Sequence, residues 1–164
     1  MQHPRSGSSL YERDFVAWLQ AQATVIRERR WADVDVEHLL EEIEDLGSSQ
    51  RRELASRIRV LLMHLLKVDL QPERDASPSW WGSIVEQADA IRDLLDASPS
   101  LLPTIPKIVY DSYPLARRRA SLEMSIAQDE MPQNMPPRVA RNFQVALDGN
   151  DEFELNPERT AHDL

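Results

Sequence analysis

One histidine and two carboxylates share a face of a predicted helix in the first third of the chain. His38, Glu42 and Asp45 are spaced by four and three residues, which places them along one side of an α-helix. An imidazole with carboxylates can bind a divalent cation, and helical bundles build metal sites from such groups. The di-iron pattern also requires Glu-x-x-His, which does not occur in this sequence. Two hypotheses follow: a metal-binding bundle, hydrolytic or oxidative, and an acidic helix start favoured by the helix dipole.

A second set of polar residues lies further along the same predicted helix. Glu53 and Arg57 are an i,i+4 pair in the favourable order, and Arg57 and His64 project to the edge of an apolar stripe. Buried charges must be paired, so we expect a polar network formed by Glu53, Arg57 and His64. Such a group could titrate within a functional cleft. The alternative is a histidine that is satisfied within the core.

The remaining chemistry is sparse. Arginines cluster in three places and could bind phosphate or an acidic partner, although we favour ordinary electrostatic roles such as salt bridging. The net charge of −9 argues against nucleic acid as a partner. The sequence has no nucleophile elbow, phosphate-binding loop, dinucleotide fingerprint or zinc-protease motif. We therefore expect no cofactor and favour a non-enzymatic protein. The arginine clusters are Arg27, Arg29 and Arg30; Arg51, Arg52 and Arg59; and Arg117, Arg118 and Arg119.

The elements that must position these residues are all predicted to be helical. Aliphatic residues dominate, only four glycines are present, and the β-branched runs that strands favour are missing. The apolar periodicity predicts helices over residues 10–29, 36–69, 80–97 and 101–124, and a short one over 137–147. Pro114 lies inside the fourth pattern and is expected to kink or split that helix. The fold class is therefore all-α: a four-helix-bundle-like domain with a long central second helix and a short C-terminal helical appendage.

The long helix predicted over residues 36–69 is the expected centre of the bundle. From Leu39 to Val68 one face of it repeats every three or four positions and is apolar except at Gln50, close to the heptad spacing of bundle packing. From Val60 to Val68 they point in every direction, so this segment is either surrounded by other helices or covered by a second subunit. We expect a flexible N-terminus at 1–9, a bundle domain at 10–128, and a C-terminal appendage and tail at 129–164.

The chain has no cysteine, and its longest apolar run is too short to span a bilayer. Its first residues lack the apolar stretch of a signal peptide. We expect a cytoplasmic protein with no membrane partner.

Several segments resemble one known family in order and spacing. These are Tyr11 with Asp14, Phe15 and Trp18; HLLEEIEDLG at 38–47; RREL at 51–54; LLMHLLK at 61–67; QPE at 71–73; and SPSL at 98–101. Over roughly residues 10–125 the chain resembles the bacterial "domain of unknown function 29" family. The resemblance implies a compact helical bundle and implies no activity. We expect a protein-interaction module that forms a homodimer or binds another protein, with the metal-binding bundle as the alternative.

Overall fold

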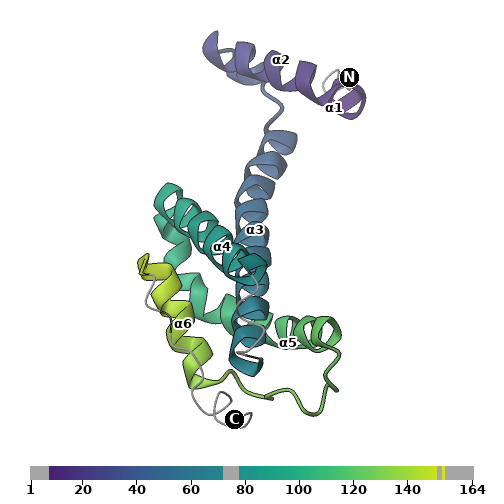
Figure 1. The fold of residues 1–164 in the computed structure, drawn as a ribbon. Coiled ribbons are helices and arrows are strands. Elements are labelled where there is room, and N and C mark those ends of the chain that lie inside the picture. The colour runs from purple at the N-terminus through teal and green to yellow at the C-terminus, as the bar shows by residue number, and fades with distance from the viewer. Residues whose placement is uncertain (1–7, 72–77, 151–152, 154–164) are drawn as a thin grey trace, which may run out of the picture. The chain divides into compact units, whose positions relative to one another are not determined.

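The computed structural model describes residues 8–71, 78–150 and 153. Within these residues it contains six α-helices and no strand, which confirms the all-α prediction (Figure 1). The chain forms two compact units, residues 1–49 and residues 50–164, and their boundary falls within the long helix α3. Residues 1–7, 72–77, 151–152 and 154–164 lie outside the described residues. Most of the N-terminus expected to be flexible (1–9) and the end of the expected C-terminal tail (129–164) therefore cannot be compared with the structure.

The N-terminal unit begins with two short helices where we predicted one. α1 spans Ser8–Arg13 and α2 spans Phe15–Arg27. They separate at Asp14, whose side chain leaves the helix and accepts a hydrogen bond from the Ala17 N–H at 3.0 Å. A carboxylate that caps a new helix start in this way satisfies a backbone donor that would otherwise lack a partner. The short helix η1 at Trp31–Asp33 then leads into α3.

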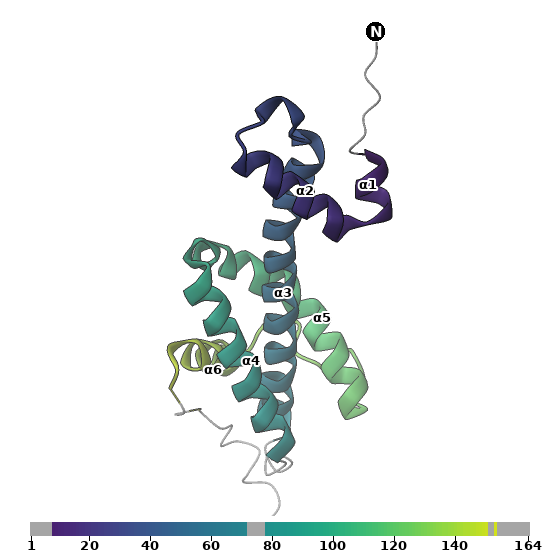
Figure 2. The ribbon, with the colours of Figure 1, turned by 90° about the horizontal axis from the view of Figure 1, so that it is seen from above.

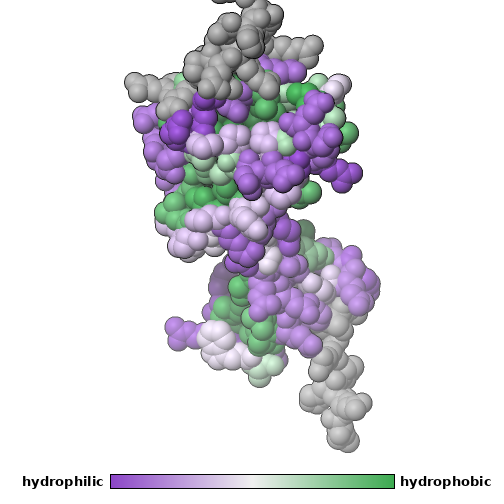
Figure 3. All heavy atoms as spheres, turned by 90° about the horizontal axis from the view of Figure 1, so that it is seen from below, coloured by the Kyte–Doolittle hydropathy of each residue, from purple (hydrophilic) through white to green (hydrophobic). Residues whose placement is uncertain are grey.

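Many large apolar side chains of the N-terminal unit face solvent. Trp18 is fully buried, and it is the only large apolar side chain among residues 10–49 in the described core. Figure 3 shows apolar side chains, in green, forming a band among the polar ones on this unit. We predicted that other helices would cover α3 along its whole length. For its first half that prediction is wrong, because Ile43 and Leu46 are 63% and 69% exposed.

The helix α3 itself, Val36–Leu70, is continuous through Gly47. Its second half is the centre of the second unit, where α4 (Pro78–Ala97) and α5 (Ile105–Met124) lie on either side of it (Figures 1 and 2). The short helix η3, Pro99–Thr104, joins α4 to α5. The helix α6, Pro137–Asp148, packs against α4 and ends at Gly149, whose φ of 74° is the left-handed conformation that glycine adopts readily.

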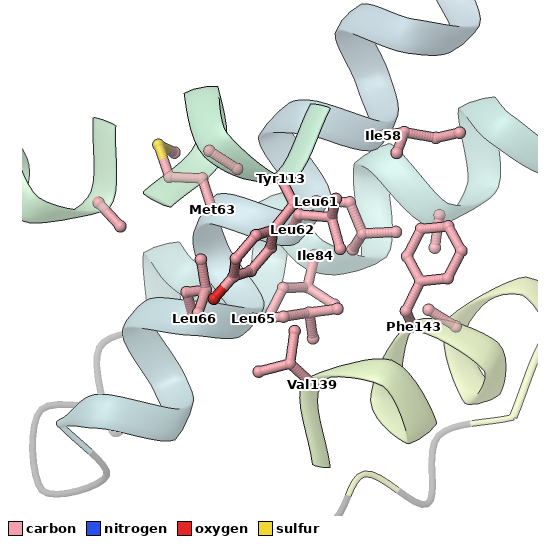
Figure 4. Packing of buried hydrophobic residues seen from close by; sticks show 14 of the residues in the cluster. Ile58, Leu61, Leu62, Met63, Leu65, Leu66, Ile84, Tyr113, Val139 and Phe143 are labelled. Atoms are coloured by element: carbon pink, nitrogen blue, oxygen red, sulfur yellow. The ribbon is translucent and has the colours of Figure 1, made fainter. Parts of the chain in front are cut away.

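Leucine and isoleucine side chains of α3 form the core of the second unit. Every apolar residue from Leu61 to Leu66 is buried, so neighbouring helices surround the segment within one chain. Figure 4 shows these side chains meeting Ile84 of α4, Tyr113 of α5, and Val139 and Phe143 of α6. Of the two interpretations of this segment, intramolecular packing is the one observed, and a second subunit is not needed to cover it.

Pro114 lies inside α5 without ending the helix. Proline removes the hydrogen bond that its N–H would donate to the carbonyl four residues earlier, here that of Tyr110. Both Pro114 and Tyr110 are exposed, so water can replace the missing donor on that face.

Replacing Leu65 with alanine should lower the free energy of unfolding by about 2–5 kcal/mol, because it opens a cavity among close-packed helices. The matched control is Leu122→Ala, since Leu122 is a leucine of α5 that is 71% exposed. It should change stability by less than about 0.5 kcal/mol. Urea denaturation followed by circular dichroism measures both, and equal effects would contradict the packing described.

Candidate functional site

The N-terminal unit is held together by a network around the carboxylate of Asp35. Asp35 lies just before α3, and its Oδ2 accepts a hydrogen bond from the indole Nε1–H of Trp18 on α2 at 3.2 Å. The same oxygen lies 2.8 Å from Nδ1 of His38. The backbone N–H of Asp35 donates to Oε1 of Gln22 at 2.8 Å. Trp18 and Gln22 are both buried, so α2 is fixed to the start of α3 through these four residues, which we call the Asp35 network.

Hydrogen bonding sets the ionisation of Asp35. Burial raises the pKa of this carboxyl, but the hydrogen bonds from His38, Trp18 and the His38 backbone N–H together outweigh burial and lower it. Asp35 is therefore ionised at neutral pH and accepts from these donors. An ionised acceptor makes stronger hydrogen bonds than a neutral one.

An aromatic residue of α1 extends this network. The Tyr11 ring lies 4.1 Å from the His38 ring and 4.8 Å from that of Trp18, measured between centroids. Its hydroxyl donates to Oε1 of Glu42 at 2.6 Å. That hydrogen bond, followed by partial burial, raises the pKa of Tyr11 to about 12. The phenol thus stays protonated and joins α1 to α3.

In these contacts His38 and Glu42 each bond to a different residue and not to each other. His38 is bonded to Asp35, and Glu42 accepts from Tyr11. Within the part of the chain that the structure describes, no group of three or more His, Cys, Asp or Glu side chains is arranged to hold a metal ion. The geometry therefore gives no support to the metal hypothesis for His38, Glu42 and Asp45.

Two rows of apolar side chains cover the outside of the same unit. On α2, Phe15, Leu19 and Ile26 recur at helical spacing and are each about 40% exposed. On the first half of α3, the spacing of Val36, Leu40, Ile43 and Leu46 likewise places them on one face, and each exposes more than half of its surface. We call these two rows, together with the exposed Trp31, the apolar surface. Monomeric proteins seldom leave so many neighbouring apolar side chains in water without a use for them.

The second unit contains the other predicted polar residues. Arg57 bonds to Glu53 through both Nε and Nη2, at 3.0 and 2.9 Å. No hydrogen bond that the structure describes links His64 to this pair, and its buried Nδ1 has no partner among the described residues. Burial lowers the pKa of His64, and the charge of Lys67 lowers it further. His64 is thus held neutral in the folded chain.

A charge pair that the sequence analysis did not identify lies one turn away from His64. Lys67 is 5% exposed, and its Nζ lies 2.9 Å from Oε2 of Glu123 on α5 and 4.4 Å from the centre of the Trp80 ring on α4. Arg119 bonds the other carboxylate oxygen at 3.1 Å. Burial raises the pKa of Glu123, but the two cations outweigh it and lower the pKa. The one signal in the sequence was a lysine inside an apolar run.

Several arginines of the predicted clusters are used in internal ion pairs. Arg30 bonds Glu28 and Asp33, and Arg119 bonds Glu123. These contacts support ordinary salt bridging for these arginines. A nucleic-acid surface gains no support from them.

The comparisons with known proteins agree with the resemblance seen in the sequence. A family model described as "Domain of unknown function DUF29" matches residues 10–145. The chain belongs to this family. The comparisons with curated proteins and with solved structures gave no match.

The DUF29 match includes both units of the chain. It takes in the Asp35 network, the apolar surface and the packed helices of the second unit. The family description assigns no activity. None of the chain's described helices is long and apolar enough to cross a membrane.

Removing the acceptor of the Asp35 network should loosen the N-terminal unit. We expect Asp35→Ala to cost about 1–3 kcal/mol, because the buried Trp18 N–H would lose its partner. Asp33→Ala is the matched control, since Asp33 forms only an exposed ion pair with Arg30, worth at most about 1 kcal/mol. Amide hydrogen exchange over residues 15–46 measures both, and equal protection in the two variants would contradict the network.

Stability of the second unit should depend on the ionisation of His64. Its folded pKa lies below the ordinary value of about 6.5, so below that pH the unfolded chain takes up the proton first. Stability should therefore fall as the pH falls below about 6.5. His64→Gln, which cannot titrate, should show a smaller fall between pH 7.5 and 5.5 in urea denaturation. Identical pH dependence in the two proteins would rule out this assignment.

Proposed function

We propose that this protein is a non-enzymatic interaction module that works as a homodimer, joined through the apolar surface of its N-terminal unit. The proposal is supported mainly by the contrast between the buried and the exposed large apolar side chains of that unit. Among the described residues of the unit, Trp18 is the only buried large apolar side chain, whereas four on α3 and three on α2 lie in rows exposed to water. Small units with so little core depend on additional contacts for stability.

The free energy gained by burying the apolar surface indicates how much of it a stable dimer must cover. Full burial of one aliphatic side chain is worth about 1.5–3 kcal/mol, so the exposed half of each α3 residue offers about 1 kcal/mol. The α3 rows of two copies together offer about 8 kcal/mol, which is comparable to the cost of association, about 4–15 kcal/mol. Burial of the α3 rows alone would therefore give a dimer of only marginal stability. A stable one also needs the α2 row.

A second copy of the chain fits this surface better than a different protein that binds only at times. In a two-fold symmetric interface the same patch occupies both sides, so apolar rows meet apolar rows. The unit also carries both signs of charge. Glu41, Glu44 and Asp45 are exposed beside the α3 row, and Arg27 and Arg29 are exposed at the end of α2. An identical subunit therefore carries charges opposite in sign to each of these groups, and it is present whenever the unit folds.

We also place the module in the cytoplasm. The support is the absence of cysteine from the sequence, which agrees with a compartment where disulfides do not form.

A charge placed in the apolar surface should separate the two copies. We expect the wild-type chain to sediment as a dimer over micromolar to near-millimolar concentrations. Ile43→Lys should be monomeric, because each interface would bury an unpaired ammonium group. Leu122→Lys is the matched control, since Leu122 on α5 of the second unit is also more than 60% exposed, and it should remain dimeric. A monomeric wild type, or a dimer that tolerates Ile43→Lys, would refute the proposal.

A further inference from the structure

A groove lies in the second unit, beside the first turns of α5. It has a volume of about 730 Å³, within the usual range for sites that bind ligands. One side is α5 from Pro106 to Pro114, and the other is the segment that contains Gln133, Asn134 and Met135. The groove is distant in sequence from the apolar surface of the N-terminal unit, and the inference drawn from it is independent of the proposed homodimer.

The far wall of the groove is fixed to α5 by hydrogen bonds. The Tyr113 hydroxyl lies 2.9 Å from the carbonyl oxygens of both Pro132 and Asn134, to which it donates its proton. Arg117 donates to the carbonyl of Met131 at 3.0 Å. Burial raises the pKa of Tyr113 to about 12, so the phenol remains a donor at neutral pH. The Tyr113 ring is packed within the core (Figure 4). The groove is therefore formed before any ligand arrives.

The lining combines flat apolar rings with hydrogen-bond donors. Pro106, Tyr110 and Pro114 provide ring faces, and the Tyr110 side chain is 79% exposed. The Tyr110 hydroxyl and the amides of Gln133 and Asn134 can each donate a hydrogen bond. A polyproline II segment has complementary properties. Its rings pack on aromatic side chains, and its carbonyl groups have no internal partners.

The length of the groove fits the same ligand. From Pro106 to Pro114 the helix rises about 12 Å, at 1.5 Å per residue. Four residues of polyproline II also extend about 12 Å, at 3.1 Å per residue. An extended peptide of that length can therefore lie along the whole lining.

One acidic side chain in the lining gives the peptide a preferred charge. Asp111 pairs with Lys107 at 2.6 Å, its one ion pair among the described residues, and both side chains are more than half exposed. Exposed pairs of this kind contribute little and exchange readily. An arginine of the ligand can replace Lys107 with a two-point hydrogen bond to the carboxylate. We propose that this groove binds a proline-rich peptide segment that carries an arginine beside its prolines.

Titration of the full chain with a blocked synthetic peptide tests this inference. The probe is Ac-Arg-Pro-Pro-Pro-Pro-Pro-NH2, followed by amide chemical shifts, and the comparison peptide is Ac-Arg-Gly-Ser-Gly-Ser-Gly-NH2. We expect saturable shifts at residues 106–114 and 133–135 with the proline peptide and at least tenfold weaker binding of the comparison peptide. No saturable shift, or equal binding of the two peptides, would overturn the proposal.

Variants test where the peptide binds, and they separate recognition of its prolines from recognition of its arginine. Tyr110→Ala should weaken the proline peptide at least tenfold, whereas Leu122→Ala, which removes an exposed side chain outside the groove, should not. Asp111→Asn should reduce the preference for the arginine peptide over Ac-Ser-Pro-Pro-Pro-Pro-Pro-NH2. All three positions are exposed, and unchanged urea denaturation verifies that each variant folds. Binding that Tyr110→Ala leaves unchanged would show that the groove is not the site.

Discussion

Hydrogen bonds from two helices converge on the carboxylate of Asp35, and the order of the N-terminal unit depends on them. Trp18 donates from α2 and His38 lies against the same oxygen from α3. Gln22 accepts the backbone N–H of Asp35 and completes the link. A unit whose described part buries a single large apolar side chain cannot rely on packing alone. The polar network therefore determines which faces of α2 and α3 turn inward and which remain in water.

The two halves of α3 have opposite environments because their neighbours differ. In the second unit, α4, α5 and α6 pack around the apolar side chains from Leu54 onward. Among the described α-helices of the N-terminal unit, α1 and α2 are the ones available to cover α3, and their contacts with it include the Tyr11–Glu42 hydrogen bond and the contact between the Tyr11 and His38 rings. The apolar face from Val36 to Leu46 is left exposed. Since water is a poor environment for such a face, we infer that association covers it.

Apolar periodicity predicted the helices well, because a buried face requires a repeat near 3.6 residues. It correctly identified the segment from Val60 to Val68 that other helices surround, where the apolar residues from Leu61 onward are buried and Val60 is partly buried, and the short helix that ends at Gly149. Periodicity does not reveal whether a neighbour is present, so it placed Ile43 and Leu46 in a core that the structure does not form. It also missed the break at Asp14, because a capping carboxylate and a helical one look alike in sequence. The Tyr113 contacts that build the groove join residues about twenty positions apart, and no local pattern encodes them.

The proposed homodimer requires the apolar face of α3 to be an interface between copies. Isotope-filtered nuclear Overhauser measurements on an equal mixture of labelled and unlabelled chains test this directly. Contacts between chains that involve the methyl groups of Leu40 and Ile43 are the predicted result. No contacts between chains, or contacts that all arise from the second unit, would contradict an interface at this face.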